Sequence, residues 1–411
     1  AYYTRPYAEE PVCVVIDAIG EWDTCSIWYK KKKVWSKRYP WSLGLFYSAI
    51  TDHIGLKPME DEYITMGMAA FAWPHSSQDL SELLKYNLHM GLPEYPMSVD
   101  KYQVAYDAQC TIEKLIIEIM KIARKYSNCL CYGGGVALNC VSNGKLLRSG
   151  IFEDIYIQPA AGDAGGAIGA AMIAWYQYLG NERKTDGETD SMNGAYLGPN
   201  YSNDNIKSYL DNNGFTYLKL KDSELPEKIA DLISQEKVIG WFQGRMEFGP
   251  RALGARSILA DPRSEKMQKK LNLKVKFRES FRPFAPSVLA EDLNNWFELE
   301  NISPYMLLVS EVKKNIQIPM STEQEKLFGI EKLNIKRSKI PAVTHVDYSA
   351  RVQTVHQETN PRYYKLIKKF KEITGCSILV NTSFNIRGEP IVCSVSDAFK
   401  CMMGTNLDIL V

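Results

Sequence analysis

The densest group of chemically capable side chains lies between Arg245 and Arg282. Eleven Lys and Arg residues meet four Asp and Glu residues there, and eleven less four leaves +7 in a chain whose total charge is +1. Several of these arginines stand among Phe, Gly and Pro residues. A guanidinium in partly apolar surroundings needs a bidentate oxyanion, either a carboxylate or a phosphate. The pattern is compatible with internal ion pairs to Glu247 and Glu279, or with a site for a triphosphate and an acyl phosphate.

A second constellation spans Tyr132–Asn143 and reads YGGGVALNCVSN. A predicted strand ends in three glycines, and we expect a helix to begin immediately after them. Glycines let the backbone approach a ligand closely, and N–H groups at a helix start bind phosphate or ribose oxygens. Asn139 is expected one turn into that helix. The candidate nucleotide-binding residues are therefore Gly134, Gly135 and Asn139. A tight strand-to-helix turn explains the glycines equally well.

Two aspartates stand at other predicted strand ends. Asp17 and Gly20 lie in a tight turn between two apolar strands, and Asp163 lies in a Gly-Asp-Ala-Gly-Gly sequence where a strand gives way to a helix. Carboxylates at two strand ends can hold a divalent cation beside phosphates, so Asp17 and Asp163 are candidate metal ligands. The alternatives are an Asx turn for Asp17 and a helix N-cap for Asp163.

The order of these motifs resembles that of a known family. Asp-x-x-Gly at a strand hairpin, Gly-Gly-Val-Ala-x-Asn and then Pro-Ala-x-Gly-Asp-Ala-Gly are similar to the actin-like (ASKHA) ATPase domain of the NodU/CmcH-type O-carbamoyltransferases. These enzymes are relatives of the tRNA threonylcarbamoyl-adenosine transferases. Further matches are Ser42–Tyr47, Glu62–Tyr63 and Met66–Ala69. The resemblance covers nearly the whole chain.

The resemblance implies a metal and a nucleotide in the first half. In that family a His-x-x-x-His pair precedes the first strand and, with aspartates matching Asp17 and Asp163, binds an iron-like divalent metal. The sequence begins just after the position of that pair, so we expect the N-terminal part of the domain to lie upstream of Ala1. The implied cofactors are ATP and a divalent metal, either iron-like or Mg²⁺ accompanying ATP.

The second half resembles the YrdC-like C-terminal domain of the same family, which adenylates carbamoyl phosphate. By that resemblance the catalytic residues that hold carbamoyl phosphate and ATP are Arg251, Lys276, Arg282, Arg351 and Ser383. Asn381 precedes Ser383 by two residues and lies on the same side of a predicted strand, so we assign it to nucleotide binding. We expect at least one of the remaining arginines of the basic window to be structural: Arg245, Arg256 and Arg278.

The elements that must position these residues alternate between strands and helices, which predicts an α/β fold. We expect an actin-like carbamoyl-transfer domain over residues 1–195 and a YrdC-like carbamoyl-phosphate adenylation domain with a mixed sheet over residues 196–411. The apolar spacing of Gln109–Tyr126 predicts a helix. A short strand is expected near Phe215–Leu218. Lys313–Lys339 has little periodicity and is predicted to be an excursion or a mobile loop.

Composition limits the class of protein. The nine cysteines have no C-x-x-C pairing, which is typical of reduced thiols and favours a cytoplasmic location. No apolar run reaches the length of a membrane span. The nearly neutral net charge gives no reason to expect non-specific nucleic-acid or membrane binding. A homodimer is left open.

The sequence therefore predicts an ATP-dependent O-carbamoyltransferase with carbamoyl phosphate as co-substrate. The acceptor is expected to be a hydroxyl group of a small molecule, and a nucleic-acid acceptor is not excluded. One alternative is an ASKHA-type small-molecule kinase, which leaves the Arg245–Arg282 window unexplained. The other alternative is a nucleotide-binding homologue without catalytic activity.

Overall fold

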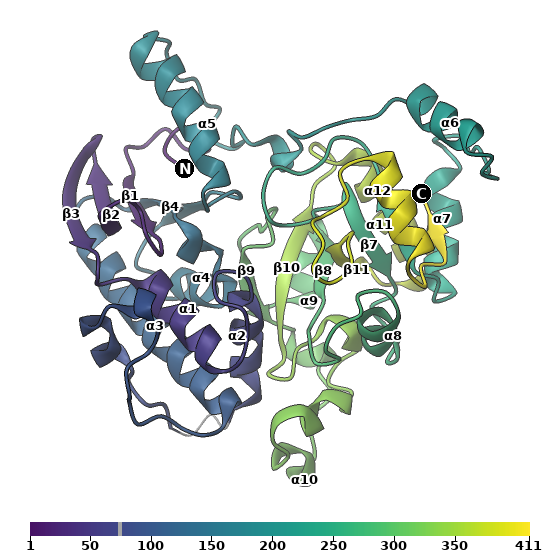
Figure 1. The fold of residues 1–411 in the computed structure, drawn as a ribbon. Helices are drawn as coiled ribbons and strands as arrows, with labels where there is room; N and C mark the ends of the chain where they lie inside the picture. The colour runs from purple at the N-terminus through teal and green to yellow at the C-terminus, as the bar shows by residue number, and fades with distance from the viewer. Residues whose placement is uncertain (73–75) are drawn as a thin grey trace. The chain divides into compact units, whose positions relative to one another are not determined.

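The computed structural model describes residues 1–72 and 76–411, and Figure 1 shows the course of the chain. The chain forms two compact units. Unit 1 comprises Ala1–Met192 and Lys326–Leu333, and unit 2 comprises Asn193–Glu325 and Asn334–Val411. Each unit has its own mixed sheet with helices, which confirms the predicted α/β class. The assignment of the units to particular domain types stays a prediction.

The sheet of unit 1 has the order β3-β2-β1-β4-β5. Strands β1, β2 and β3 form an antiparallel meander, and β4 and β5 continue the sheet parallel to β1. The strand β4 is almost wholly buried, as expected for a strand flanked by parallel neighbours. The bounds are β1 Val12–Ile16, β2 Asp23–Tyr29, β3 Lys32–Arg38, β4 Cys129–Gly133 and β5 Asp154–Ile157.

Within the described residues of unit 1, five α-helices accompany this sheet. Helix α1 packs against α2 and α3, and α3 contacts β1. Side chains cap three of them, since Ser42 caps α1, Asp100 caps α3 and Asn139 caps α4. In Figure 1 α5 extends away from the sheet, and none of its residues is buried. The bounds are α1 Leu43–His53, α2 Glu62–Met68, α3 Lys101–Ala123, α4 Cys140–Arg148 and α5 Ala164–Ile173.

The sheet of unit 2 has the order β12-β6-β7-β11-β8-β10-β9. Strands β6, β7, β11 and β8 are joined by antiparallel pairing, while β12 runs parallel to β6 and β10 runs parallel to β8. The bounds are β6 Ile239–Phe242, β7 Arg256–Ala260, β8 Ala285–Leu289, β9 Leu308–Glu311, β10 Ser349–Val355, β11 Ile378–Ser383 and β12 Ile409–Leu410.

The helices of unit 2 cover its strands. Helices α7 and α11 pack on each other, α11 contacts β8 and β11, and α12 contacts β6 and β12. The bounds are α6 Asn203–Asn212, α7 Leu225–Ser234, α8 Met267–Lys274, α9 Leu293–Trp296, α10 Thr322–Glu325, α11 Pro361–Thr374 and α12 Val395–Met403.

The predicted strand near Phe215–Leu218 is wrong. The segment has no regular backbone pairing, although its residue types favour a strand. One of its two aromatic residues packs through its ring instead, because Phe215 stacks on Phe399 of α12 with ring centroids 3.7 Å apart. Tertiary packing has overridden the local preference.

The segment Lys313–Lys339 is an excursion, which is one of the two predictions made for it. It contains short helical turns, and its Lys326–Leu333 part belongs to unit 1. Phe328 there lies edge-on to Tyr102 of α3, with ring centroids 6.2 Å apart. Within residues 1–72 and 76–411, no helix is long and apolar enough to cross a membrane.

Gly134 offers a test of the packing of unit 1. Its φ is +90°, and a Cβ there would lie 2.1 Å from the carbonyl oxygen of Ile16. Gly134→Ala should therefore lower the free energy of unfolding of unit 1 by about 2 kcal/mol or more, measured by urea denaturation. Gly133→Ala is the matched control, because its Cβ would meet nothing within 4 Å. Equal losses in the two variants would contradict the close approach of Gly134 to the end of β1.

Candidate functional site

Asp17 lies directly after β1 in a firmly held turn of unit 1. Its N–H donates to the carbonyl of Thr24 at 2.9 Å, and its Oδ1 accepts from the N–H of Ala18 at 2.8 Å. The hydroxyl of Ser42 donates to the carbonyl of Ala18 at 2.6 Å. Gly44 allows α1 to approach, since a Cβ there would lie 2.5 Å from the Cα of Ala18. The matching sequence Ser42–Tyr47 thus fixes the turn that carries Asp17.

Asp163 stands at the start of α5 and is exposed. Asp163 occupies the N-cap position of α5, as the alternative reading expected, but its side chain makes no capping hydrogen bond. Burial raises the pKa of Asp17, and the negative charge of Asp163 raises it further, against the lowering effect of the N–H groups of Ala18 and Gly135. The charge of Asp163 therefore acts on Asp17.

The Asp17–Asp163 pair fits a divalent cation only in part. Two neighbouring carboxylates repel each other, and a cation between them removes that repulsion. In the part of the chain that the structure describes, no group of three or more His, Cys, Asp or Glu side chains could hold a metal ion. The pair thus supplies carboxylate oxygens but not a full ligand set.

The glycine turn between β4 and α4 packs against the turn that carries Asp17. Gly134 donates its N–H to the carbonyl of Ala161 at 2.8 Å. A Cβ on Gly135 would lie 3.0 Å from Oδ1 of Asp17. Both glycines are therefore required by close packing around Asp17, whatever they bind.

The helix expected immediately after the glycines is a short 3₁₀ helix, and the α-helix starts later than expected. Residues Gly135–Leu138 form a 3₁₀ turn, and α4 begins only at Cys140. Asn139 is the N-cap of α4, and its Oδ1 accepts from the N–H of Ser142 at 3.0 Å. Asn139 therefore stands before the helix rather than one turn inside it.

Asn139 also joins a buried polar network that the sequence did not reveal. Its amide exchanges hydrogen bonds with Gln109 of α3 at 3.1 and 3.2 Å. Gln109 also donates to Glu113 at 2.7 Å and accepts from the hydroxyl of Tyr47 at 2.7 Å. Glu113 in turn forms an ion pair with Lys145. The i, i+4 spacing of Gln109 and Glu113 on one helix was the available signal.

In unit 2 the structure brings Lys276, Ser383 and Arg282 together. The ammonium group of Lys276 donates to the carbonyl of Ser383 at 2.5 Å and to its hydroxyl at 3.2 Å. It also donates to the side-chain and backbone oxygens of Asn385 at 2.6 and 3.0 Å. Burial lowers the pKa of Lys276 well below its usual value, and the charges of Arg278 and Arg282 lower it further. Three basic side chains, those of Lys276, Arg278 and Arg282, thus influence one another here.

Asn381 ties together the segments that carry the other predicted residues. Its Nδ2 donates to the carbonyl of Ala252, next to Arg251, at 3.1 Å and to Oε1 of Gln353 at 2.8 Å. Gln353 lies two residues after Arg351 on β10 and donates to the carbonyl of Leu253 at 2.8 Å. Asn381 is 1% exposed. The structure therefore gives it a positioning role between the Arg251 loop, β10 and β11.

Glu247 is a further organising residue of the Arg251 loop. Its Oε1 accepts from the N–H groups of Leu253 at 2.6 Å and Ala255 at 2.8 Å. Burial raises the pKa of Glu247, while these backbone donors lower it. The basic residues in its neighbourhood had suggested an ion pair, whereas Glu247 binds mainly backbone.

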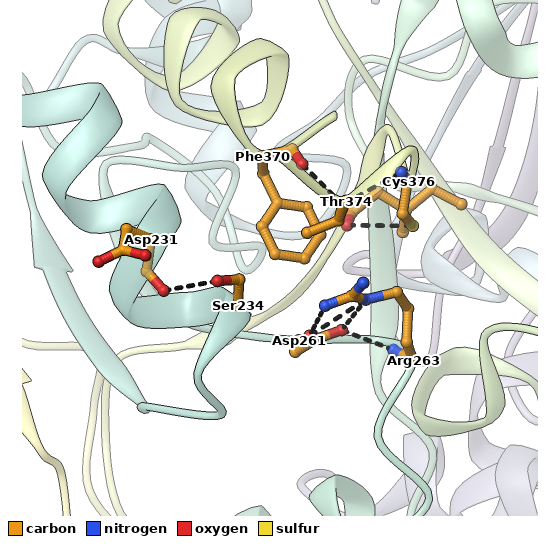
Figure 2. Close-up of polar contacts among 8 residues, drawn as sticks. Asp231, Ser234, Asp261, Arg263, Phe370, Thr374 and Cys376 are labelled. Carbon is orange, nitrogen blue, oxygen red and sulfur yellow. Dashed lines mark hydrogen bonds and ion pairs between the residues drawn. The ribbon is translucent and has the colours of Figure 1, made fainter. Parts of the chain in front are cut away.

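Other arginines of the basic window are structural, as expected. Arg256 is fully buried, lies 3.7 Å from the ring centroid of Phe242 and donates to carbonyl groups such as that of Pro199 at 3.2 Å. Figure 2 shows the guanidinium of Arg263 facing the carboxylate of Asp261, with contacts of 2.6 Å and 3.0 Å. The window therefore mixes internal ion pairs with the Lys276 cluster.

Two family models match this chain. The model described as Carbamoyltransferase N-terminus matches residues 1–101 and 90–172, and the model described as Carbamoyltransferase C-terminus matches residues 230–411. The chain belongs to the NodU/CmcH family of carbamoyltransferases.

Curated relatives agree with the family models. An uncharacterized protein of Synechocystis is 47% identical, over 100% of this chain and 73% of the relative. Nodulation protein NolO of Bradyrhizobium diazoefficiens is 38% identical, over 90% of this chain and 68% of the relative. The 3'-hydroxymethylcephem-O-carbamoyltransferase of Streptomyces clavuligerus is 30% identical, over 88% of this chain and 66% of that enzyme.

The proximity of the two aspartates predicts a shift that can be measured. Asp163→Asn should lower the pKa of Asp17, because it removes the negative charge that disfavours ionisation of Asp17. A titration of ¹³C-labelled aspartate carboxyl groups by NMR measures this pKa. Asp52→Asn, which removes an exposed carboxylate of α1, should leave it unchanged. An unchanged pKa of Asp17 in Asp163→Asn would show that the two carboxylates do not face each other.

Proposed function

We propose that this chain is part of an ATP-dependent O-carbamoyltransferase, in which unit 2 adenylates carbamoyl phosphate and unit 1 passes the carbamoyl group to a hydroxyl acceptor. The main support is the cluster of Lys276, Arg282 and Ser383 in a chain of the carbamoyltransferase family. A group of buried cations beside a serine hydroxyl is suited to phosphate oxygens.

The proposed activation gathers negative charge at one place. Carbamoyl phosphate, ATP and one water give carbamoyl-adenylate, pyrophosphate and inorganic phosphate. Every reactant except water is an anion, so preorganised cationic donors lower the barrier by stabilising the charge that develops. Lys276 and Arg282 would provide these donors from fixed positions, with Arg251 and Arg351 brought in by the segments that Asn381 joins.

Lys276 is positioned to respond to such a ligand. Its hydrogen-bond partners among the described residues are neutral oxygens of Ser383 and Asn385, not carboxylates. A phosphate oxygen near Ser383 would therefore supply a negative charge that these partners do not. The hydroxyl of Ser383 can donate to the same oxygen.

Transfer is assigned to the Asp17 turn of unit 1. A divalent metal held there by Asp17, Asp163 and further ligands would supply Lewis-acid polarisation of the carbamoyl carbonyl or of the acceptor hydroxyl. Gly134 and Gly135 would serve transfer by holding the Asp17 turn in place, because they pack closely against Ile16 and Oδ1 of Asp17. An ionised Asp17 would also orient the acceptor hydroxyl.

The sheet orders support the proposed domain types. In unit 1 an antiparallel meander is extended by two parallel strands, which fits one half of an actin-like fold. In unit 2 the mixed sheet fits a YrdC-like domain. A kinase hypothesis would leave the Lys276 cluster without a role, so carbamoyl transfer is preferred.

The acceptor is proposed as a class only. The relative from Streptomyces clavuligerus is named for a hydroxymethyl group on a small molecule. A hydroxyl of a small molecule is accordingly the proposed acceptor for this chain, with a nucleic-acid hydroxyl as the other arm of any acceptor screen.

Exchange of labelled pyrophosphate into ATP tests the activation step. The protein should catalyse this exchange only when carbamoyl phosphate is present, because re-formation of ATP requires the carbamoyl-adenylate. Arg282→Lys should lower the exchange rate about tenfold or more, since one charge-assisted hydrogen bond is worth about 1.5–3 kcal/mol.

Arg263→Lys is the matched control, because the partner of Arg263 is the internal carboxylate of Asp261 (Figure 2). It should leave the exchange rate nearly unchanged. Absence of carbamoyl-phosphate-dependent exchange from the wild-type protein would refute adenylation in this chain.

A further inference from the structure

A carboxylate lies inside the cationic cluster of unit 2. Oε2 of Glu279 lies 3.0 Å from Nε of Arg282, and Oε1 of Glu279 lies 2.8 Å from Nη1 of Arg387. Arg282 follows three residues later in the same segment, whereas Arg387 comes from the loop after β11. Glu279 therefore bridges two guanidinium groups that are far apart in sequence.

The loop that carries Arg387 is fixed to the Lys276 cluster. The N–H of Arg387 donates to the carbonyl of Lys276 at 3.1 Å. Asn385 accepts from Lys276 and donates to the carbonyl of Glu389 at 2.7 Å. Arg387 thus belongs to the same site as Lys276 and Ser383, although no motif in the sequence pointed to it.

The three charged side chains differ in exposure. The side chain of Arg282 is 8% exposed, that of Glu279 is 30% exposed and that of Arg387 is 51% exposed. An anion that arrives from solvent therefore meets Arg387 and Glu279 before it reaches Arg282. Its own charge is repelled by Glu279 and attracted by both arginines.

Glu279 has the chemistry of a stand-in for a phosphate group. A carboxylate and a phosphate are the two oxyanions that a guanidinium binds through paired oxygens. Burial raises the pKa of Glu279, but the nearby charges of Arg282, Arg387 and Arg278 help to hold it below its usual value. Glu279 is thus ionised and competes directly with an anionic ligand.

The contact with Arg282 is the weaker half of this bridge. Among the described residues, Oε2 of Glu279 accepts no hydrogen bond, so its contact with Arg282 is ionic only. The segment that carries Glu279 lies between α8 and β8 and has no regular secondary structure. The Glu279 side chain is 30% exposed as a whole, although its Oε2 is buried against Arg282, so exchange requires this carboxylate to turn outward toward Arg387 and solvent.

We propose that Arg387 is a further oxyanion-binding residue of this site, and that Glu279 is its internal counter-ion, exchanged for the phosphate oxygens of the ligand. The proposal deepens the proposed function and rests on it for the source of the phosphate, which is either ATP or carbamoyl phosphate. Exchange of one anion for another keeps the charge of the cluster balanced in both states.

Calorimetric titration of the protein with inorganic pyrophosphate, and separately with carbamoyl phosphate, tests this proposal. Glu279→Gln should bind pyrophosphate about tenfold more tightly than wild type, because the competing charge is gone. Arg387→Met should bind it about tenfold more weakly, because one charge-assisted hydrogen bond is lost. The carbamoyl phosphate titration shows which of the two phosphate sources Arg387 serves.

Two control variants make the same changes of charge at positions outside the cluster. Glu372→Gln removes an exposed carboxylate of α11 that pairs with Lys369, and Arg38→Met removes an exposed guanidinium of β3 that pairs with Asp23. Neither should change the affinity for pyrophosphate. These variants separate local exchange from an effect of net charge.

Two outcomes would overturn the proposal. Weaker or unchanged binding by Glu279→Gln would make Glu279 a structural partner of the arginines, and unchanged binding of both probes by Arg387→Met would remove Arg387 from the site. Arg387 is exposed, so its variant keeps the fold even where Glu279→Gln does not. Neither titration depends on carbamoyl transfer. The exchange assay can therefore refute the proposed function while the titrations support anion binding by Arg387. Conversely, the titrations can exclude Arg387 while the exchange assay supports the proposed function.

Discussion

The electrostatic balance around Lys276 is the constraint on which unit 2 depends. Its ammonium group is buried against neutral oxygens of Ser383 and Asn385, and the charges of Arg278 and Arg282 act on it. Like charges in a poorly solvated place require an anion nearby. Glu279 supplies one carboxylate, and the network of Asn381 and Gln353 keeps the surrounding strands in register. The fold thus gathers the basic side chains that the proposed function assigns to an oxyanion.

Unit 1 brings together negative rather than positive charges, which a bound ion of opposite charge would likewise stabilise. Asp163 raises the cost of ionising Asp17, and the close packing of Gly134 on β1 leaves Asp17 little freedom to move away. A site with too much negative charge is suited to a cation, as the Lys276 cluster is suited to an anion. The opposite charges of the two sites support the proposed division of one reaction into activation and transfer.

The sequence predicted what depends on local pattern or on a specific motif. Apolar periodicity identified the helix over Gln109–Tyr126, although α3 begins earlier at Lys101 because Asp100 caps it. The motifs identified the family, and the resemblance brought Lys276 and Ser383 together before the structure showed their contact. Properties that follow from the spacing of residues along one chain segment could therefore be predicted from the sequence.

Contacts between segments that are far apart in the sequence could not be predicted from such spacing. The stacking of Phe215 on Phe399 replaced a predicted strand, and the 3₁₀ turn after the glycines moved Asn139 to a cap position. Glu247 and Arg387 take their roles from partners that the linear sequence does not indicate. Whether a basic residue of the Arg245–Arg282 window is free to bind a ligand depends on its ion pairs and its burial. Neither property can be predicted from the composition of the window.

Hydrogen–deuterium exchange measured by mass spectrometry tests most directly whether the Lys276 cluster is the oxyanion site. Carbamoyl phosphate and ATP are added one at a time and then together. Slower exchange is predicted for the backbone amides of residues 253–256, 276–283 and 383–387 when the phosphate ligands bind. Unchanged exchange in all three segments at saturating ligand would contradict the placement of the activation step in unit 2.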